Sequence, residues 1–348
     1  MIIAILFAVK KRLTNLSVNI LLLLTTVVLF FLGGEILLRV TGVQQIGPTA
    51  INIYQKSDDP DISYRLLPNL SVKAFREIVT TDQHGFRSRP IDPKKPSIAV
   101  LGDSVTFGYG LRDDQTIPAI VASHLPSYNV INAGVPGYHL GQELALYRKN
   151  IAPLKPSVLV VVFFPNDLNF DMAFLDDQGI LRSEGWTPGQ VVGCDPITKG
   201  ILGLLPGKCF LDLHSAFYKF VKKIVNMRSN EQQLKAEQEK SRTSIFDDNA
   251  TPEKLARYDG QLGALAAMLP SSMPRLFVIW PDRDLHFVSR PVLARIAEKR
   301  GFKVLDLYQI YGNRMETLGW DTLHPSAAAV SEAGKTIADV LRYWKMVK

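Results

Sequence analysis

The stretch Val158-Leu-Val-Val-Val-Phe-Phe164 decides the fold, because it is apolar at every position. A strand of this composition is typically buried on both faces, as the strands of parallel sheets are. Shorter apolar runs also predict strands, at 98–101, 128–132, 276–280 and 303–307. Segments with helical spacing separate or follow them, at 116–125, 141–150, 252–268, 290–300 and 325–344. This alternation predicts a doubly wound α/β fold around a parallel five-stranded sheet.

Residues that favour helix ends support these boundaries. Thr116 and Thr251 are expected to cap two of the helices, and Gly301 to end the helix at 290–300. Pro325 suits the first turn of the last helix, because proline is tolerated there. The polar tract at 229–240 predicts a further, solvated helix.

The chain also contains a long apolar segment near its start. Val18–Leu38 has 21 almost wholly apolar residues, and about 20 suffice to cross a bilayer as a helix. Lys10, Lys11 and Arg12 precede it, which favours a cytoplasmic amino terminus. We therefore expect residues 1–15 in the cytoplasm, a transmembrane anchor at 16–40, and the rest of the chain in a periplasm or outside the cell.

Two alternatives compete with an anchor at this segment. A cleaved signal peptide needs small residues in an Ala-x-Ala-like pattern, whereas Gly33-Gly34-Glu35 is followed by bulky residues. A buried core helix is disfavoured by the length of the segment and by its place at the chain terminus. The sequence therefore favours an uncleaved anchor.

Length and composition exclude several classes of protein. The 348 residues are 47% apolar and 21% charged, which excludes a disordered chain and a polytopic membrane protein. The net charge of +7 lies partly beside the apolar segment, and the remaining excess is scattered. We therefore expect no nucleic-acid partner.

Regions outside the predicted sheet divide the rest of the chain. Residues 41–95 are polar and contain proline, which predicts a stalk and a collar with few strands. Residues 96–348 form the predicted α/β domain, interrupted by an insertion at about 168–250. The two cysteines, Cys194 and Cys209, both lie in this insertion. They either form one disulfide, as an oxidising compartment allows, or remain separate thiols.

Two motifs at opposite ends of this domain carry the chemistry. Gly102-Asp-Ser104 follows the first predicted strand, and Asp321-Thr-Leu-His324 precedes the last predicted helix. A serine hydroxyl becomes a nucleophile when a base takes its proton, and His324 is the candidate base. Asp321 is placed to bond the other ring nitrogen and fix its tautomer. The pair of motifs predicts acyl transfer through a covalent serine intermediate.

Two further turns supply candidate donors for the oxyanion that such a reaction develops. Gly137 ends the segment that follows the second strand, and its backbone N–H is unobstructed by a side chain. Asn166 follows the third strand and offers its side-chain amide. Both segments also read as ordinary turns after strands.

These four segments, in this order, resemble the blocks of the SGNH (GDSL-type) hydrolase superfamily. The resemblance implies a flavodoxin-like three-layer α/β/α fold, esterase, lipase or acyltransferase activity, and no metal or other cofactor. It assigns Ser104 as nucleophile, with Asp321 and His324 completing the triad. It assigns the oxyanion hole to the backbone N–H of Ser104 together with Gly137 and Asn166. One departure is Phe164, where family members usually have glycine, and it is expected to narrow the acyl pocket or to re-aim Asn166.

The anchor and the collar more loosely resemble membrane-tethered SGNH proteins that act on O-acetylated envelope polysaccharides. We therefore expect a serine esterase that removes an acyl group, acetyl above all, from an extracytoplasmic glycan. Three alternatives keep the same sequence features. They are transfer of the acyl group to a polysaccharide, hydrolysis of lipid esters, and a non-catalytic scaffold that binds glycan.

Overall fold

The computed structural model describes residues 2–44, 51–187, 204–225, 250–282, 286, 288–313, 315–319, 321 and 323–348, with side chains from residue 16 onward. The chain divides into two units. The anchor unit consists of Met1–Thr49 and Gly189–Arg228, and the globular unit of Ala50–Pro188 and Ser229–Lys348. The predicted helix at 229–240 lies outside the described residues.

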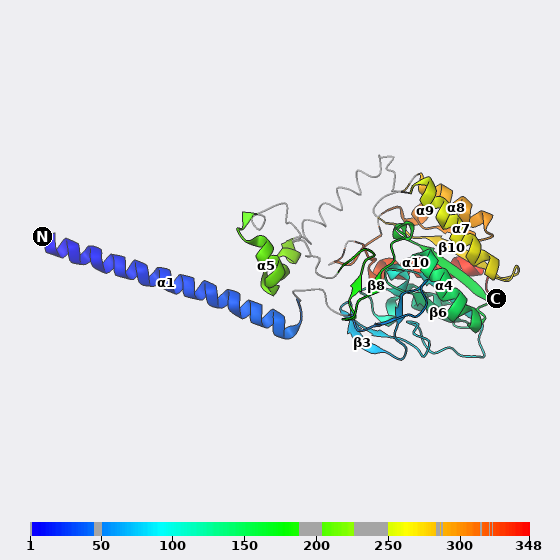
Figure 1. Cartoon of the computed structure of the whole chain (residues 1–348), viewed down its shortest axis with the longest axis horizontal. Helices are drawn as coiled ribbons and strands as arrows, with labels where there is room; N and C mark the ends of the chain where they lie inside the picture. The colour runs from blue at the N-terminus through cyan, green and yellow to red at the C-terminus, as the bar shows by residue number, and fades with distance from the viewer. Residues whose placement is uncertain are drawn as a thin grey trace. The chain divides into compact units, whose positions relative to one another are not determined.

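The globular unit is built on a five-stranded sheet, as the sequence predicted (Figure 1). The strands lie in the order β11-β10-β7-β5-β6, and every neighbouring pair is parallel. Their bounds are β5 Ser97–Gly102, β6 Asn129–Gly134, β7 Val158–Phe163, β10 Arg275–Ile279 and β11 Lys303–Asp306. Read from β6 to β11, and counting only these five strands along the chain, the order is 2-1-3-4-5. This is the flavodoxin-like order.

The two faces of this sheet pack into separate hydrophobic cores. Successive side chains of a strand point to opposite faces. Ala99 and Leu101 of β5 therefore join one core, and Ile98 and Val100 join the other. Every residue of β5 and β7 is buried. Burial on both faces explains why the sequence of β7 is apolar throughout.

Helices cover both cores and make the fold three-layered, as expected. Side chains of α4, α7 and α8 belong to one core, and those of α3 and α10 belong to the other. Within each layer the helices contact one another, α4 with α7, α7 with α8, and α3 with α10. Their bounds are α3 Ile117–His124, α4 Leu140–Leu146, α7 Pro252–Met268, α8 Ser289–Lys299 and α10 Ala327–Tyr343.

Side-chain caps begin four of these helices, α3, α4, α7 and α10. The hydroxyl of Thr116 accepts a hydrogen bond from Ala119 N, and Thr251 caps α7 in the same way. The prediction for Pro325 is wrong. Helix α10 begins at Ala327 with Ser326 as its cap, and Pro325 instead pairs with Thr317 in an isolated antiparallel bridge.

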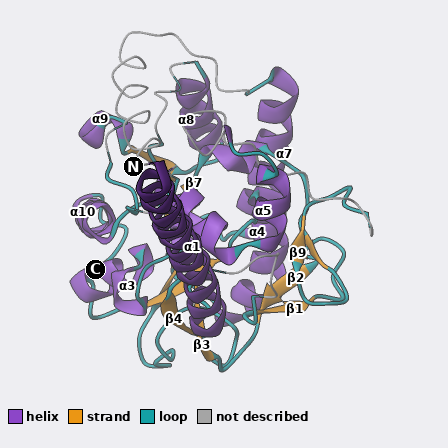
Figure 2. Cartoon of the chain, turned by 90° about the vertical axis from the view of Figure 1, so that its left-hand side faces the viewer, coloured by secondary structure: helices purple, strands orange, loops and turns teal. Residues whose placement is uncertain are grey.

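The collar contains two antiparallel strand pairs, more than the sequence predicted (Figure 2). Strand β1 Tyr54–Lys56 pairs with β2 Tyr64–Leu66, and β3 Ser71–Ala74 pairs with β4 Glu77–Thr80. Phe75 and Arg76 connect β3 to β4, and both have positive φ, at 53° and 73°. Such a two-residue turn is usually marked by Asn-Gly or Asp-Gly, so this hairpin has no recognisable sequence signal.

Short elements complete the globular unit. The insertion contributes one antiparallel pair, β8 Phe174–Leu175 with β9 Leu181–Arg182. The remaining helical segments are α2 Ser104–Phe107 and α9 Tyr308–Tyr311, 3₁₀ turns at Asp113–Gln115, Ala152–Leu154 and Pro165–Leu168, and a π-helical turn at Tyr147–Ile151.

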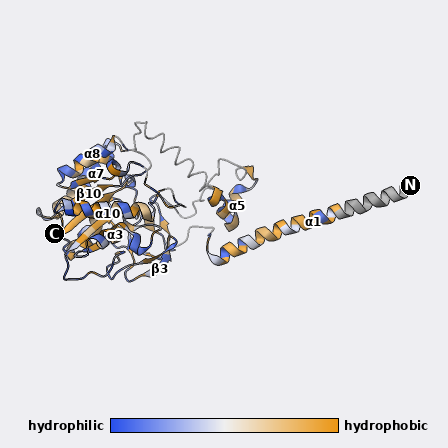
Figure 3. Ribbon diagram, turned by 180° about the vertical axis from the view of Figure 1, so that it is seen from behind, coloured by the Kyte–Doolittle hydropathy of each residue, from blue (hydrophilic) through white to orange (hydrophobic). Residues whose placement is uncertain are grey.

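The anchor unit contains the long helix α1, Ile2–Thr41. Within it, Leu16–Thr41 is long and apolar enough to cross a membrane, and it is the one such helix among the described residues. Figure 3 colours most of this stretch as hydrophobic, and its large apolar side chains are exposed. The unit also contains α5, Lys208–His214, and a helix at 216–225.

Backbone contact between β6 and α2 makes Gly134 sensitive to substitution. A Cβ atom at Gly134 would lie 2.3 Å from the backbone nitrogen of Phe107. We expect Gly134→Ala to lower the free energy of unfolding by about 1–3 kcal/mol, as overpacking does. Urea unfolding of the full chain in detergent micelles measures this change.

Gly260 of α7 provides the matched control, because a Cβ atom there has no neighbour within 4 Å. Alanine favours a helix interior over glycine by up to about 1 kcal/mol, so Gly260→Ala is expected to keep or raise stability. Equal effects of the two substitutions would contradict the close approach of β6 to α2.

Candidate active site

The structure brings Ser104, His324 and Asp321 into one hydrogen-bonded chain. Ser104 Oγ lies 2.9 Å from His324 Nε2, and His324 Nδ1 lies 2.8 Å from Asp321 Oδ2. A carboxylate only accepts hydrogen bonds, so Nδ1 carries the proton and Nε2 is left to accept from the serine hydroxyl. These distances suit a nucleophile, its base and the group that orients the base.

Ser104 is the first residue of α2 and follows a sharp turn at the end of β5. Gly102, the last residue of β5, has no room for a side chain, because a Cβ atom would lie 2.1 Å from Thr106 Oγ1. Asp103 then caps α2 by accepting a hydrogen bond from Val105 N at 2.8 Å. The turn places Ser104 at the carboxyl end of the central strands, where ligands of such sheets bind.

His324 is held by a small antiparallel ladder that precedes α10. Leu318 N donates to the carbonyl of His324 at 2.9 Å, and Ser326 N donates to the carbonyl of Glu316 at 2.8 Å. Tyr109, from the segment after α2, stacks on the imidazole with ring centroids 4.1 Å apart and an angle of 19° between the rings. The ladder fixes the backbone of His324, and the stack fixes its ring.

Asp321 is held in its charged form by several donors. Its Oδ1 accepts from Leu323 N at 2.7 Å and from His324 N at 3.0 Å, while Oδ2 faces the imidazole. Partial burial opposes ionisation, but the hydrogen bonds from the His324 ring and the two backbone N–H groups prevail and lower the pKa of Asp321. A carboxylate in this state stabilises the imidazolium that forms when His324 takes a proton.

Asn166 lies beside the nucleophile, in the 3₁₀ turn after β7. Its Nδ2 donates to Asp103 Oδ2 at 2.8 Å, so the neighbour of Ser104 orients the amide. An amide nitrogen carries two hydrogens, which leaves a second N–H beyond the one bound to Asp103. Burial raises the pKa of Asp103, although the bonds from Val105 and Asn166 partly offset that effect.

Gly137 lies in the turn that follows β6, the neighbour of β5 in the sheet. Its φ is +83°, and a Cβ atom would lie 2.8 Å from the hydroxyl of Tyr64. That hydroxyl donates to the carbonyl of Pro136 at 2.7 Å, while Tyr138 donates back to the carbonyl of Tyr64. The collar therefore braces the Gly137 turn. The roles of Gly137 and Asn166 as oxyanion donors stay predictions.

Phe164 is part of the hydrophobic core. Its side chain is buried in the same core as Val105 and Trp280. The Asn166 amide is directed at Asp103. The expectation that Phe164 re-aims Asn166 or narrows the acyl pocket stays a prediction.

Two further buried carboxyl groups interact with Asp103. Burial raises the pKa of Glu143 well above its usual value, and the charge of Asp103 raises it further. Burial also raises the pKa of Asp167, with Glu143 and then Asp103 adding to the effect. Neither oxygen of Glu143 has a hydrogen-bond partner among the described residues. Both shifts favour the neutral form of these two carboxyl groups.

Sequence reasoning missed Tyr109, Tyr64 and Glu143. Tyr109 follows the Gly102-Asp-Ser104 motif closely, and that nearness was its only signal. Tyr64 lies in the collar and Glu143 lies in α4, each without a distinctive pattern. Their importance follows from packing that local sequence does not encode.

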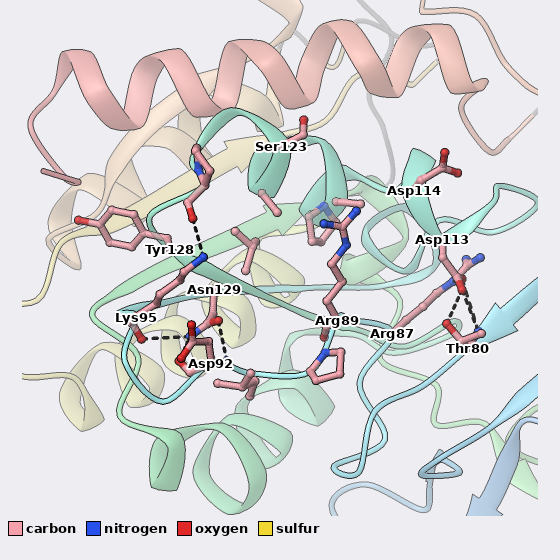
Figure 4. Close-up of a pocket in the computed structure, with 18 residues that line it drawn as sticks. Thr80, Arg87, Arg89, Asp92, Lys95, Asp113, Asp114, Ser123, Tyr128 and Asn129 are labelled. Carbon is pink, nitrogen blue, oxygen red and sulfur yellow. Dashed lines mark hydrogen bonds and ion pairs between the residues drawn. The ribbon is translucent and has the colours of Figure 1, made fainter.

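A cavity of about 690 Å³ lies away from these residues (Figure 4). Its described lining comes from the collar, α3 and β6, and includes neither Ser104 nor His324. Several polar groups in it already have partners, such as Arg87 with Asp113 at 2.7 Å and Lys95 with the carbonyl of Pro126 at 2.9 Å. We therefore assign no ligand to this cavity.

One of the two predicted disulfide residues lies within the described part of the chain. Cys209 is disulfide-bonded. Cys194 lies outside the described residues.

Comparisons with known proteins give structural relatives. The sequence matches no protein-family profile and no curated protein. Among solved structures, TesA is 14% identical over 72% of this chain and 99% of its own, with a TM-score of 0.42. A lipase/acylhydrolase from Enterococcus faecalis is 15% identical over 71% and 95%, with a TM-score of 0.40. AlinE4, an SGNH-hydrolase family esterase, is 17% identical over 72% and 96%, with a TM-score of 0.36.

The buried acid Glu143 makes stability depend on pH. Its pKa is above the model-peptide value of 4.5 in the folded chain, so above pH 4.5 the unfolded state releases a proton that the folded state keeps. The free energy of unfolding then falls as pH rises, until the folded group ionises. We expect Glu143→Gln to flatten this fall, by about 1.4 kcal/mol for each unit of pKa shift removed.

Thermal unfolding between pH 5 and pH 8 measures the effect in detergent micelles. Glu332→Gln is the control, because Glu332 is exposed on α10 and should leave the slope unchanged. A slope that Glu143→Gln does not change would contradict a neutral, buried Glu143.

Proposed function

We propose that this chain is a membrane-tethered serine esterase of the SGNH type that removes acetyl groups from an extracytoplasmic glycan. The hydrogen-bonded chain from Ser104 through His324 to Asp321 carries the proposal. Residues 220 positions apart in the sequence meet there with distances suited to proton transfer.

In the first half of the reaction, Ser104 Oγ attacks the carbonyl carbon of the ester while His324 Nε2 takes its proton. The carbonyl oxygen becomes negative and is stabilised by the backbone N–H groups of Ser104 and Gly137 and by the Asn166 amide. His324 then returns the proton to the departing sugar oxygen. The C–O bond to the sugar breaks and leaves an acetyl group on Ser104.

In the second half, His324 takes a proton from water, and the hydroxide oxygen attacks the acetyl carbon. The bond to Ser104 Oγ breaks, and the proton on His324 returns to Ser104. Acetic acid leaves, gives its proton to the solvent and becomes acetate, and the enzyme is restored. Asp321 keeps the imidazole oriented throughout and stabilises its positive charge.

A short acyl group is proposed because the nucleophile and its base have little exposed surface. Ser104 and His324 are each only 8% exposed.

The side of the membrane on which the globular unit lies is proposed from the charges that flank the amino-terminal apolar segment. Lys10, Lys11 and Arg12 lie before the apolar segment of α1 and favour a cytoplasmic amino terminus. The globular unit then lies on the other side of the membrane, where an envelope or secreted glycan is within reach.

The nucleophile is tested by removing it. We expect fluorophosphonate to label the full-length protein, and Ser104→Ala to abolish labelling and lower ester hydrolysis by about 10³-fold or more. Ser123→Ala is the control, because Ser123 is exposed on α3 and should change neither readout. Unchanged labelling and hydrolysis in Ser104→Ala would contradict the proposal.

The substrate is tested with the same protein. Acetate release from an acetylated polysaccharide, with acetyl esters turned over faster than long-chain esters, supports the proposal. Acetyl transfer to an acceptor glycan without free acetate would identify a transferase, and faster turnover of long-chain esters would identify a lipid esterase.

Tyr109 is expected to act as a positioning residue for His324. Tyr109→Ala removes the stacked ring, so we expect kcat to fall by about tenfold with little change in KM, as misplacement of a catalytic group does. Tyr109→Phe keeps the stack and should restore kcat. Steady-state hydrolysis of an acetyl ester measures both variants. Equal losses in the two variants would show that the hydroxyl, not the stack, matters.

A further inference from the structure

Glu35 lies within the apolar segment of α1, yet its carboxylate is fully bonded. Oε1 accepts from Arg39 Nε at 2.6 Å and from Ala216 N at 2.9 Å. Oε2 accepts from Ser215 Oγ at 2.8 Å and from Phe217 N at 2.8 Å. A carboxylate in an apolar segment is costly unless it is paired. Glu35 avoids this cost by capping the amino terminus of the helix at 216–225.

A further hydrogen bond and the packing of Phe217 also attach the insertion to α1. Arg39 Nη2 donates to the carbonyl of His214, the last residue of α5, at 2.7 Å. Phe217 lies on Gly34, where a Cβ atom would come within 2.5 Å of its ring. Phe30 and Phe31 meet the Phe217 ring edge-on, with centroids 5.8 Å and 5.2 Å away. The absence of a side chain at Gly34 therefore makes room for this aromatic contact.

An ion pair joins α5 to the helix at 216–225. Lys222 Nζ donates to Asp212 Oδ1 at 2.8 Å, and both side chains are buried. Cys209 of α5 is held by a disulfide. We refer to residues 208–225, which form α5 and the helix at 216–225, as the docked helix pair. The pair is a built element bound to the carboxyl-terminal end of α1.

Large apolar side chains remain on the outside of the docked helix pair. Phe210 is 66% exposed, and Ile224 and Val225 are also exposed. The same helix pair packs against the apolar segment of α1 through Phe217, which contacts Phe30 and Phe31. The apolar side chains of that segment of α1 are themselves exposed.

The depth of the docked helix pair in the bilayer follows from the geometry of α1. About 20 residues cross the hydrocarbon core of a bilayer, so the stretch Val18–Leu38 spans it, and Glu35 lies within one helical turn of its carboxyl end. Phe30 and Phe31 lie roughly 6–8 Å deeper along the axis than Glu35, at 1.5 Å per residue. Phe217 contacts both rings, so the docked helix pair lies at the boundary between headgroups and acyl chains.

We propose that the docked helix pair is a membrane-interface element, with Phe210, Ile224 and Val225 inserted into the same bilayer that α1 crosses. The occupant of this surface is lipid, because Phe217 holds the pair against Phe30 and Phe31, within the segment of α1 that crosses the bilayer. Glu35 is a positioning residue that holds the pair at this depth. The inference depends on α1 crossing a membrane and is independent of the chemistry at Ser104.

Depth-dependent quenching tests this proposal on the full-length protein in vesicles of phosphatidylcholine and phosphatidylglycerol. Phe210→Trp adds a fluorophore at the exposed apolar face, and Tyr343→Trp adds one at an 82% exposed position of α10 as the control. Lipids brominated near the headgroup should quench the added emission of Phe210→Trp at least about twofold more than that of Tyr343→Trp, as insertion by 5–10 Å implies.

Combining Phe210→Trp with Glu35→Gln tests the positioning role, because glutamine cannot accept from all the groups that Glu35 binds. We expect quenching to fall toward the control while fluorophosphonate labelling persists. Equal quenching of Phe210→Trp and Tyr343→Trp would overturn the proposal and leave this face for a protein partner. Quenching that Glu35→Gln does not change would overturn the role of Glu35.

Discussion

The burial of β5 and β7 on both faces is the constraint on which the rest of the globular unit depends. Both strands are surrounded by core side chains, so their backbones are fixed and their carboxyl ends emerge at one edge. Ser104 follows β5 and Asn166 follows β7, so both are placed by the same sheet. His324 reaches this edge from a ladder before α10, which packs on the same sheet. The bond between Ser104 and His324 is a consequence of that arrangement.

The pKa values of the buried and half-buried carboxyl groups near Ser104 are shifted in opposite directions. Asp321 accepts two backbone N–H bonds in addition to the His324 contact, and its charge is stabilised. Glu143 has no hydrogen-bond partner for either oxygen among the described residues, and burial raises its pKa. Asp103 lies between these cases, because it accepts two hydrogen bonds of 2.8 Å and still has a raised pKa. Hydrogen-bond donors near Ser104 therefore oppose the effect of burial on these pKa values to different extents.

Much of the fold was predictable because local patterns determined it. The apolar run at 158–164 became β7, and Thr116 and Thr251 cap helices as expected. The hairpin at Phe75 and Arg76 was not predictable, since neither residue signals positive φ. Pro325 was misplaced because its pairing with Thr317 depends on a ladder formed by residues outside the motif.

In the candidate site, too, some features follow from local motifs and others from contacts between residues distant in sequence. Motif order was enough to predict that Ser104, Asp321 and His324 meet. Tyr109 and Tyr64 act through packing with residues distant in sequence, so no local pattern marks them. No local pattern marks the bonds of Glu35 to residues 215–217 either, and they emerge only from the folded chain.

The central claim is that Ser104 carries the acyl group between the two halves of the reaction. Mass spectrometry of peptides, after brief exposure to an activated acetyl ester and acid quenching, tests it most directly. We predict one acetyl group on the peptide that contains Ser104, and its loss when the ester is exhausted. Hydrolysis without any acetyl group on that peptide, or with a transient acetyl group on another residue, would contradict the account.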